Sequence, residues 1–157
     1  MHPTTLAILL TAPLILAAAP NPPAPKPAMA PPAAASAKEP EHITIQHVLI
    51  GFTGSVPGKN ITRTQDEAKK LAEEILARAK KGEDFDGLVK KYTDDSPPGI
   101  YAMANNGVAP AAGEYARKGM VPAFGDAGFP LQVGEFGMAS YDKTKSPYGW
   151  HIVKRLK

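Results

Sequence analysis

Two stretches about a hundred residues apart, ITIQHVLI at residues 43–50 and SPYGWHIV at residues 146–153, predict the fold. Alternation in the first places Ile43, Ile45, His47 and Leu49 on one face of a strand, and that face is apolar apart from its histidine. In the second, a turn leads into a β-rich run that sets His151 among large apolar side chains. We therefore expect two strands, each carrying an inward histidine, with helices and loops between them.

Composition restricts the class of protein before any motif is considered. The chain has 157 residues, and about the first forty differ in composition from the rest and are not expected to join the core of the domain. The absence of Cys from the sequence excludes disulfides, thiolate nucleophiles and cysteine zinc sites. The net charge of +3 arises from mixed-charge stretches, so we expect solvated helix faces and no nucleic-acid partner.

The N-terminal part divides into a leader, residues 1–19, and a tether, residues 20–40. Residues 6–19 form an apolar run of fourteen, which is too short for a membrane span of roughly twenty residues but typical of a secretory signal. A cleaved signal, an uncleaved anchor and a leader that is not exported all remain open, because no Lys or Arg precedes the run and Pro20 follows its Ala-Ala-Ala. The tether holds eight prolines and should be extended. We expect an exported protein of the periplasm or cell envelope.

Residues 41–157 should form one domain. After the first strand, Thr64 and Glu67 make a capping box that starts a helix with an apolar stripe, which Gly82 ends. Further patterns predict a second helix that ends at Asp94-Asp95, a short strand at 99–103, a long loop at 104–118, a third helix opening at 120–124, and strands at 135–141 and 149–156.

This order of motifs resembles the parvulin-type peptidyl-prolyl cis/trans isomerases over about residues 43–156. The resemblance implies an α+β fold with a four-stranded antiparallel sheet covered by three to four helices. It also implies a catalytic group of His47, Asp95, His151 and Ser146. Met120 and Phe124 match the family's proline pocket. The family's usual second-strand motif is replaced here, so Ile100 and Tyr101 are the expected pocket residues from that strand.

The chemistry that the resemblance implies requires no cofactor, because the barrier to rotation about an X-Pro bond is the loss of amide resonance. Two histidines and an aspartate can also form a metal-binding triad, but no short His spacing accompanies them here, so we expect no metal. The expected partners are proline-containing polypeptides of exported proteins. Only Lys59 is basic in the loop at residues 51–60, so a phosphoserine-proline preference is not expected. A non-catalytic, chaperone-like peptide-binding module is the alternative.

Overall fold

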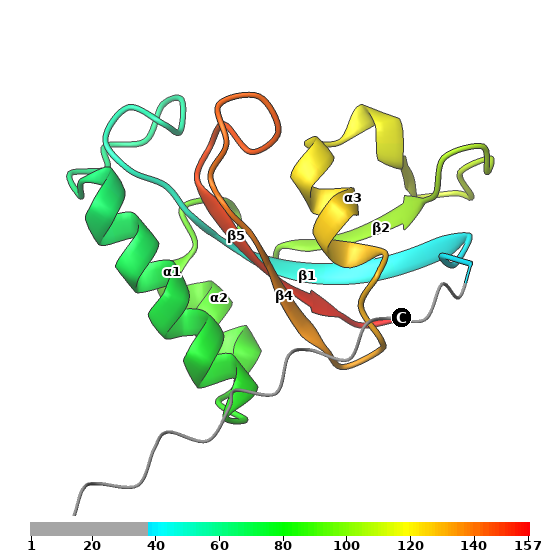
Figure 1. Ribbon diagram of the computed structural model, residues 1–157, viewed down its shortest axis with the longest axis horizontal. Helices are drawn as coiled ribbons and strands as arrows, with labels where there is room; N and C mark the ends of the chain where they lie inside the picture. The colour runs from blue at the N-terminus through cyan, green and yellow to red at the C-terminus, as the bar shows by residue number, and fades with distance from the viewer. Residues whose placement is uncertain (1–37) are drawn as a thin grey trace, which may run out of the picture. The chain divides into compact units, whose positions relative to one another are not determined.

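The computed structural model describes residues 38–157, so the expected leader and most of the tether lie outside the described residues. Within this part the chain forms five strands, three α-helices and one short 3₁₀ helix (Figure 1). Their bounds are β1 His42–Ile50, α1 Gln65–Lys80, α2 Phe85–Tyr92, β2 Ile100–Ala104, β3 Tyr115–Ala116, η1 Arg117–Gly119, α3 Pro122–Gly128, β4 Phe136–Ala139 and β5 Trp150–Arg155. No helix among residues 38–157 is both long and apolar enough to cross a bilayer.

The sheet has the strand order β3-β2-β1-β5-β4, with β1 at its centre. The pairs β2–β1, β1–β5 and β5–β4 are antiparallel, which confirms the expected α+β class and its four antiparallel strands. The fifth strand, β3, lies within residues 104–118, which we expected to be a loop, and it pairs in parallel with β2. Its two residues are too few to show alternation, so pairing at the sheet edge defines this strand rather than a local sequence pattern.

Strand β1 is buried on both faces, because helices cover each side of the sheet (Figure 1). Val48 and Ile50 pack in a core cluster with residues of α1 and α2. Ile43 and Ile45 face the other way and pack in a second cluster with residues of α3. The alternation predicted from the sequence therefore directs His47 toward the α3 side of the sheet.

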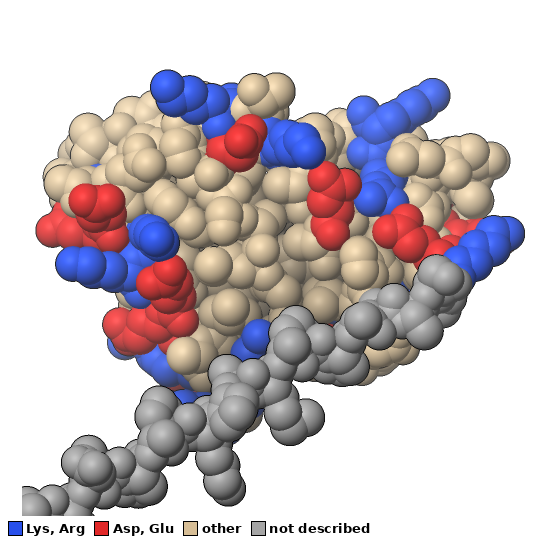
Figure 2. All heavy atoms as spheres, viewed as in Figure 1, with Lys and Arg blue, Asp and Glu red and all other residues tan. Residues whose placement is uncertain are grey.

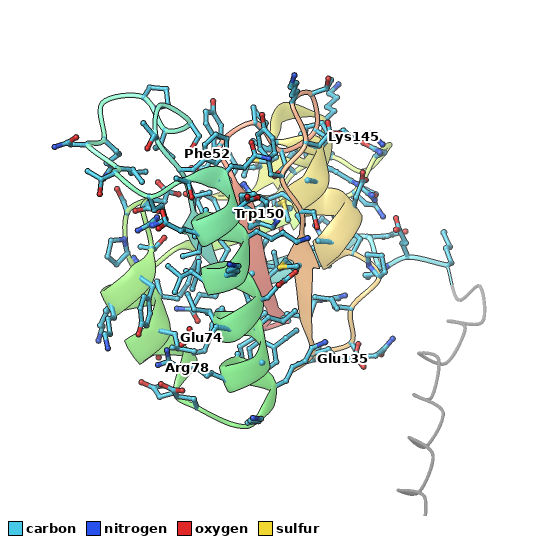
Figure 3. The ribbon with its side chains drawn as sticks, turned by 60° about the vertical axis from the view of Figure 1, so that its left-hand side comes forward. Phe52, Glu74, Arg78, Glu135, Lys145 and Trp150 are labelled. Atoms are coloured by element: carbon cyan, nitrogen blue, oxygen red, sulfur yellow. The ribbon has the colours of Figure 1, made fainter. Side chains whose placement is uncertain are left out.

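Helix α1 begins as its capping box predicts. The Thr64 side chain accepts a hydrogen bond from the Glu67 backbone N–H, and the Glu67 carboxylate accepts one from the Thr64 N–H at 2.7 Å. Ala68, Ala72 and Ile75 are fully buried, and the small alanines let the helix lie close to the sheet. Figure 3 shows Glu74 and Arg78 near one another on this helix, where they form an ion pair, and Arg78 also donates to the Tyr92 hydroxyl of α2 at 3.0 Å.

The segment after α2 is fixed to the end of β1. Thr93 Oγ1 accepts a hydrogen bond from the Leu49 N–H at 3.1 Å, and the Asp94 N–H donates to the Leu49 carbonyl at 2.8 Å. The Asp94 carboxylate accepts from the Gly51 N–H at 2.8 Å and also pairs with Arg63. These contacts determine where the next residue, Asp95, must lie.

Candidate active site

The two expected histidines meet on the α3 side of the sheet. His47 and His151 are 1% and 2% exposed, and they are diagonal neighbours, because Leu49 pairs with His151 and His47 pairs with Val153. Their Nδ1 atoms are 3.2 Å apart, and the rings are stacked with centroids separated by 5.4 Å. One Nδ1 must carry the proton and the other must accept it, so each histidine fixes the tautomer of its partner.

Asp95 continues this line of hydrogen bonds. Its Oδ2 lies 3.2 Å from His47 Nε2 and accepts a second hydrogen bond from the Tyr101 hydroxyl at 3.2 Å. If His47 donates from Nε2 to the carboxylate, then His47 Nδ1 is the acceptor and His151 donates from its Nδ1. The chain therefore runs from His151 through His47 to a half-buried carboxylate that still reaches solvent.

The surroundings lower the pKa values of both Asp95 and His151, with opposite consequences for their charge. The hydrogen bond from His47 holds the pKa of Asp95 down to about 2, against the opposing effect of partial burial. Burial, together with the neighbouring His47, lowers the pKa of His151 to about 3. At neutral pH the site thus presents Asp95 as a carboxylate anion and His151 as a neutral buried imidazole.

An apolar cavity of about 290 Å³ opens beside this group. Phe124 closes its base, with its ring edge-on to His47 at 4.6 Å and to His151 at 4.9 Å. Among the residues expected in the pocket, Met120 and Tyr101 also line this cavity. The remaining lining residues are His47, Leu49, Val56, Pro57, Asp95, Val121, Tyr148 and His151. Its volume and apolar walls suit a proline ring and part of its neighbour.

Ile100 does not reach this cavity, which corrects one expectation from the sequence. It pairs with Gln46 and lies 48% exposed, whereas the next residue, Tyr101, pairs with Ile45. Successive side chains of a strand point to opposite faces, so β2 can contribute Tyr101 or Ile100 to the cavity but not both. The structure places Tyr101 there.

Ser146 is fully buried, but its hydroxyl bonds to neither imidazole. It donates to the Gly149 carbonyl at 2.8 Å and so closes the turn that leads into β5. Gly149 has φ of +141°, and a Cβ atom on it would lie 2.1 Å from the Ile50 carbonyl oxygen. The turn therefore requires glycine, and Ser146 acts on the site by placing the strand that carries His151.

Three residues that were not expected from the sequence either line the cavity or hold the segments around it: Gln46, Gly99 and Tyr148. The buried Gln46 amide donates to Asp86 Oδ1 at 2.7 Å and to the Pro98 carbonyl at 3.0 Å, which holds the loop that follows Asp95. Gly99 has φ of +65°, and a Cβ there would lie 2.6 Å from the His47 carbonyl oxygen. The polar Gln46 next to His47 in a mostly apolar strand was the available signal, whereas Tyr148 reaches the cavity only through tertiary packing.

His47 Nδ1 faces His151 Nδ1, and His47 Nε2 faces Asp95, whereas the buried His151 Nε2 has no hydrogen-bond partner among the described residues, so the nitrogen atoms do not converge on one point. Within residues 38–157, no group of three or more His, Cys, Asp or Glu side chains has a geometry that can hold a metal ion. The arrangement is that of a hydrogen-bonded chain beneath an apolar cavity.

Burial of His151 predicts a loss of stability in mild acid. Its folded-state pKa of about 3 lies below the unfolded value of ~6.5, so the unfolded chain binds the extra proton as the pH falls below about 6.5. The free energy of unfolding should therefore decrease between pH 6.5 and 5, above the range in which carboxylates titrate. Urea unfolding at several pH values measures this slope, and His151→Leu should flatten it. An equal slope in wild type and variant would contradict the assignment.

Comparison with known proteins agrees with this geometry. The family model for the PPIC-type PPIase domain matches residues 33–157. The chain is 40% identical to the foldase protein PrsA of Geobacillus kaustophilus over 86 residues, which are 55% of this chain and 27% of that protein. It is 28% identical to the chaperone SurA of Pseudomonas fluorescens over 117 residues, or 74% of this chain and 23% of that one. The chain thus spans about a quarter of the length of these relatives.

The solution structure of TbPIN1 has a similar fold, with a TM-score of 0.55 at 23% identity, covering 74% of this chain and 98% of that one. At this identity the likeness concerns the fold alone. The match to the family model, in contrast, includes every strand and helix described above. The chain therefore belongs to the PPIC-type, or parvulin-type, peptidyl-prolyl cis/trans isomerases.

Proposed function

We propose that this domain accelerates cis/trans isomerisation of X-Pro bonds in polypeptide clients and thereby assists their folding. The observation that carries the proposal is an apolar cavity bordered by a carboxylate whose pKa is held at about 2. Isomerisation of these bonds takes tens to hundreds of seconds unaided, which is slow enough to limit folding. The printed names of the relatives, foldase and chaperone, agree with such a role.

The proposed mechanism divides the work between the cavity and the carboxylate. Phe124 and Met120 hold the proline ring, which fixes one side of the amide. In the planar amide, resonance places negative charge on the carbonyl oxygen, and twisting returns that electron density to nitrogen. A fixed anion near the carbonyl oxygen disfavours the planar state more than the twisted one, so it lowers the barrier. In this proposal Asp95, which lines the cavity, is that anion.

The histidines are positioning residues in this proposal. Both are almost fully buried, and His47 holds Asp95 while His151 fixes the tautomer of His47. Neither needs to exchange a proton with the substrate, because no bond is made or broken during rotation. A protease-coupled assay on a panel of Ala-Pro, Leu-Pro and Phe-Pro peptides tests the proposal: catalytic amounts of the protein should raise the rate above the thermal background, and equal rates would refute it.

Phosphorylation of the residue before proline should not increase turnover. No Lys or Arg of residues 38–157 lines the cavity, and the Arg63 guanidinium is paired with Asp94. Lys145, in the loop between β4 and β5 (Figure 3), is also not among the residues that line the cavity. A phosphate dianion would therefore lose hydration without gaining a fixed partner. Comparing kcat/KM for Ser-Pro and phosphoserine-Pro peptides should show no gain; a tenfold gain would mean that a basic site has been overlooked.

The charged surface also favours a polypeptide client over nucleic acid. Figure 2 shows Lys and Arg interspersed with Asp and Glu on the face drawn, without a broad region of one sign. Binding to a phosphate backbone requires clustered cations. A disrupted second strand would favour the non-catalytic alternative, since the family's usual motif is replaced there; β2 nevertheless forms and pairs with β1 over five residues.

We further propose that the protein acts outside the cytoplasm, in the periplasm or cell envelope. The support is the apolar run at residues 6–19 followed by a proline-rich tether. Cell fractionation followed by N-terminal sequencing tests this placement. A chain beginning near residue 20, or an intact chain recovered with membranes, is the expected result. An intact chain in the soluble cytosolic fraction would contradict it.

A further inference from the structure

The segment between β2 and β3 brings one exposed aromatic residue back to the edge of the sheet. Strand β3 pairs in parallel with β2, and Tyr115 is the register partner of Met103. Paired residues of neighbouring strands share a face of the sheet, and Met103 lies on the same face of β2 as Tyr101. Tyr115 therefore lies on the side of the sheet that carries the cavity.

Aromatic rings connect Tyr115 to the cavity. Its ring centroid lies 5.9 Å from that of Tyr101, and Tyr101 lies 5.6 Å from Phe124 at an interplanar angle of 90°. Tyr101 and Phe124 both line the cavity, whereas Tyr115 is 53% exposed just beyond it. A single exposed apolar residue is ordinary on a protein surface. What distinguishes Tyr115 is that its exposed ring continues the wall of the proposed active site.

The surrounding segment is held by specific contacts. The Glu114 carboxylate accepts a hydrogen bond from the Ala111 N–H at 2.9 Å and lies 2.8 Å from His42 Nδ1 at the start of β1. Beyond Tyr115, Arg117 donates to Asn105 at 2.9 Å and to Glu39 at 2.6 Å. Contacts on both sides of Tyr115 thus fix its backbone, so a partner that packs against the ring has little ordering cost to overcome.

We propose that Tyr115 forms a second subsite, which takes an aromatic or large aliphatic side chain of the same polypeptide whose proline occupies the cavity. This rests on the proposed function. An extended peptide advances ~3.3 Å per residue, so the two centroid steps of 5.6 and 5.9 Å span at most about three and a half residues, and a bent path places that side chain two or three residues from the proline. The subsite would direct the domain toward X-Pro bonds within apolar stretches of unfolded clients.

Peptides that carry Phe or Ser at one to four residues on either side of a fixed Ala-Pro test this subsite. Affinity is measured by fluorescence anisotropy and turnover by the isomerisation assay. Wild type should prefer Phe over Ser by about three- to tenfold in affinity and in kcat/KM at an offset of two or three residues on one side. Tyr115→Ser should reduce this ratio to about one, and Tyr115→Phe should retain it.

Ile100→Ser is the matched control, because Ile100 has similar exposure but lies on the opposite face of β2. It should keep the preference for Phe. An unchanged ratio in Tyr115→Ser, or an equal loss in Ile100→Ser, would overturn the subsite. The two measurements separate the proposals: a Tyr115-dependent binding preference without any isomerisation would refute catalysis alone, whereas isomerisation indifferent to Tyr115 would refute the subsite alone.

Discussion

The Phe124→Ala variant should bind proline peptides at least about tenfold more weakly and lose about 3 to 5 kcal/mol of unfolding free energy. The side chain is 3% exposed and contacts both histidines as well as Tyr101, so its removal opens a void at the base of the cavity. The proline ring loses the same contact in the planar and the twisted states. KM should therefore rise while kcat changes less. Peptide titrations below the melting temperature of the variant measure this.

The control variant Phe129→Ala separates the loss of stability from the loss of peptide binding that we expect for Phe124→Ala. Phe129 belongs to the same core cluster and is equally buried, but it does not line the cavity. It should cost a similar amount of stability and leave KM of the folded protein near the wild-type value. If both variants weaken peptide binding to the same degree, the loss reflects a disturbed core and Phe124 is not the base of a proline socket.

The Asp95→Asn variant should lower kcat by about ten- to hundredfold without weakening peptide binding. Asparagine has the same shape, and its amide oxygen can still accept hydrogen bonds from His47 and Tyr101. The substitution thus removes mainly the negative charge. Because that charge raises the free energy of the bound planar amide more than that of the twisted amide, its loss should raise the barrier and, if it changes affinity at all, tighten binding of the planar peptide.

Asp126→Asn provides the charge control for this experiment. Asp126 is an exposed residue of α3 that pairs with Arg117 outside the cavity. Its neutralisation changes the net charge by the same amount and should leave kcat unaltered. Equal losses in the two variants would show that a general electrostatic effect, and not a local anion at the amide, sets the rate.

The parts of this fold that the sequence predicts best are those with a repeated local pattern. Alternation in β1 places Ile45 and His47 on one face, and the capping box begins α1 at its observed residue. Strand β3 escaped prediction because two residues show no period, and it exists through its pairing with β2. Local pattern thus determines long elements, whereas short edge strands depend on tertiary contacts.

The candidate site shows the same division. The motif order was enough to name Met120 and Phe124, which both line the cavity. It did not decide between Ile100 and Tyr101, because that choice depends on the parity of the β1–β2 register. Nor did it include Val56 and Tyr148, which reach the cavity from two loops joined by a hydrogen bond from Ser55 Oγ to the Tyr148 carbonyl at 2.8 Å. Such loop contacts follow from the folded structure alone.

Exchange spectroscopy by NMR tests the central claim most directly, since it observes cis and trans peptide signals without a coupled protease. In the presence of catalytic amounts of the wild-type protein, exchange peaks between the two isomers of an Ala-Pro peptide should appear within a mixing time of about a second or less, far below the uncatalysed exchange time. Asp95→Asn should bind the same peptide, as its shifted signals report, but show much weaker exchange peaks. Binding by the wild type without any exchange peak would contradict catalysis and show that the domain binds peptides without isomerising them.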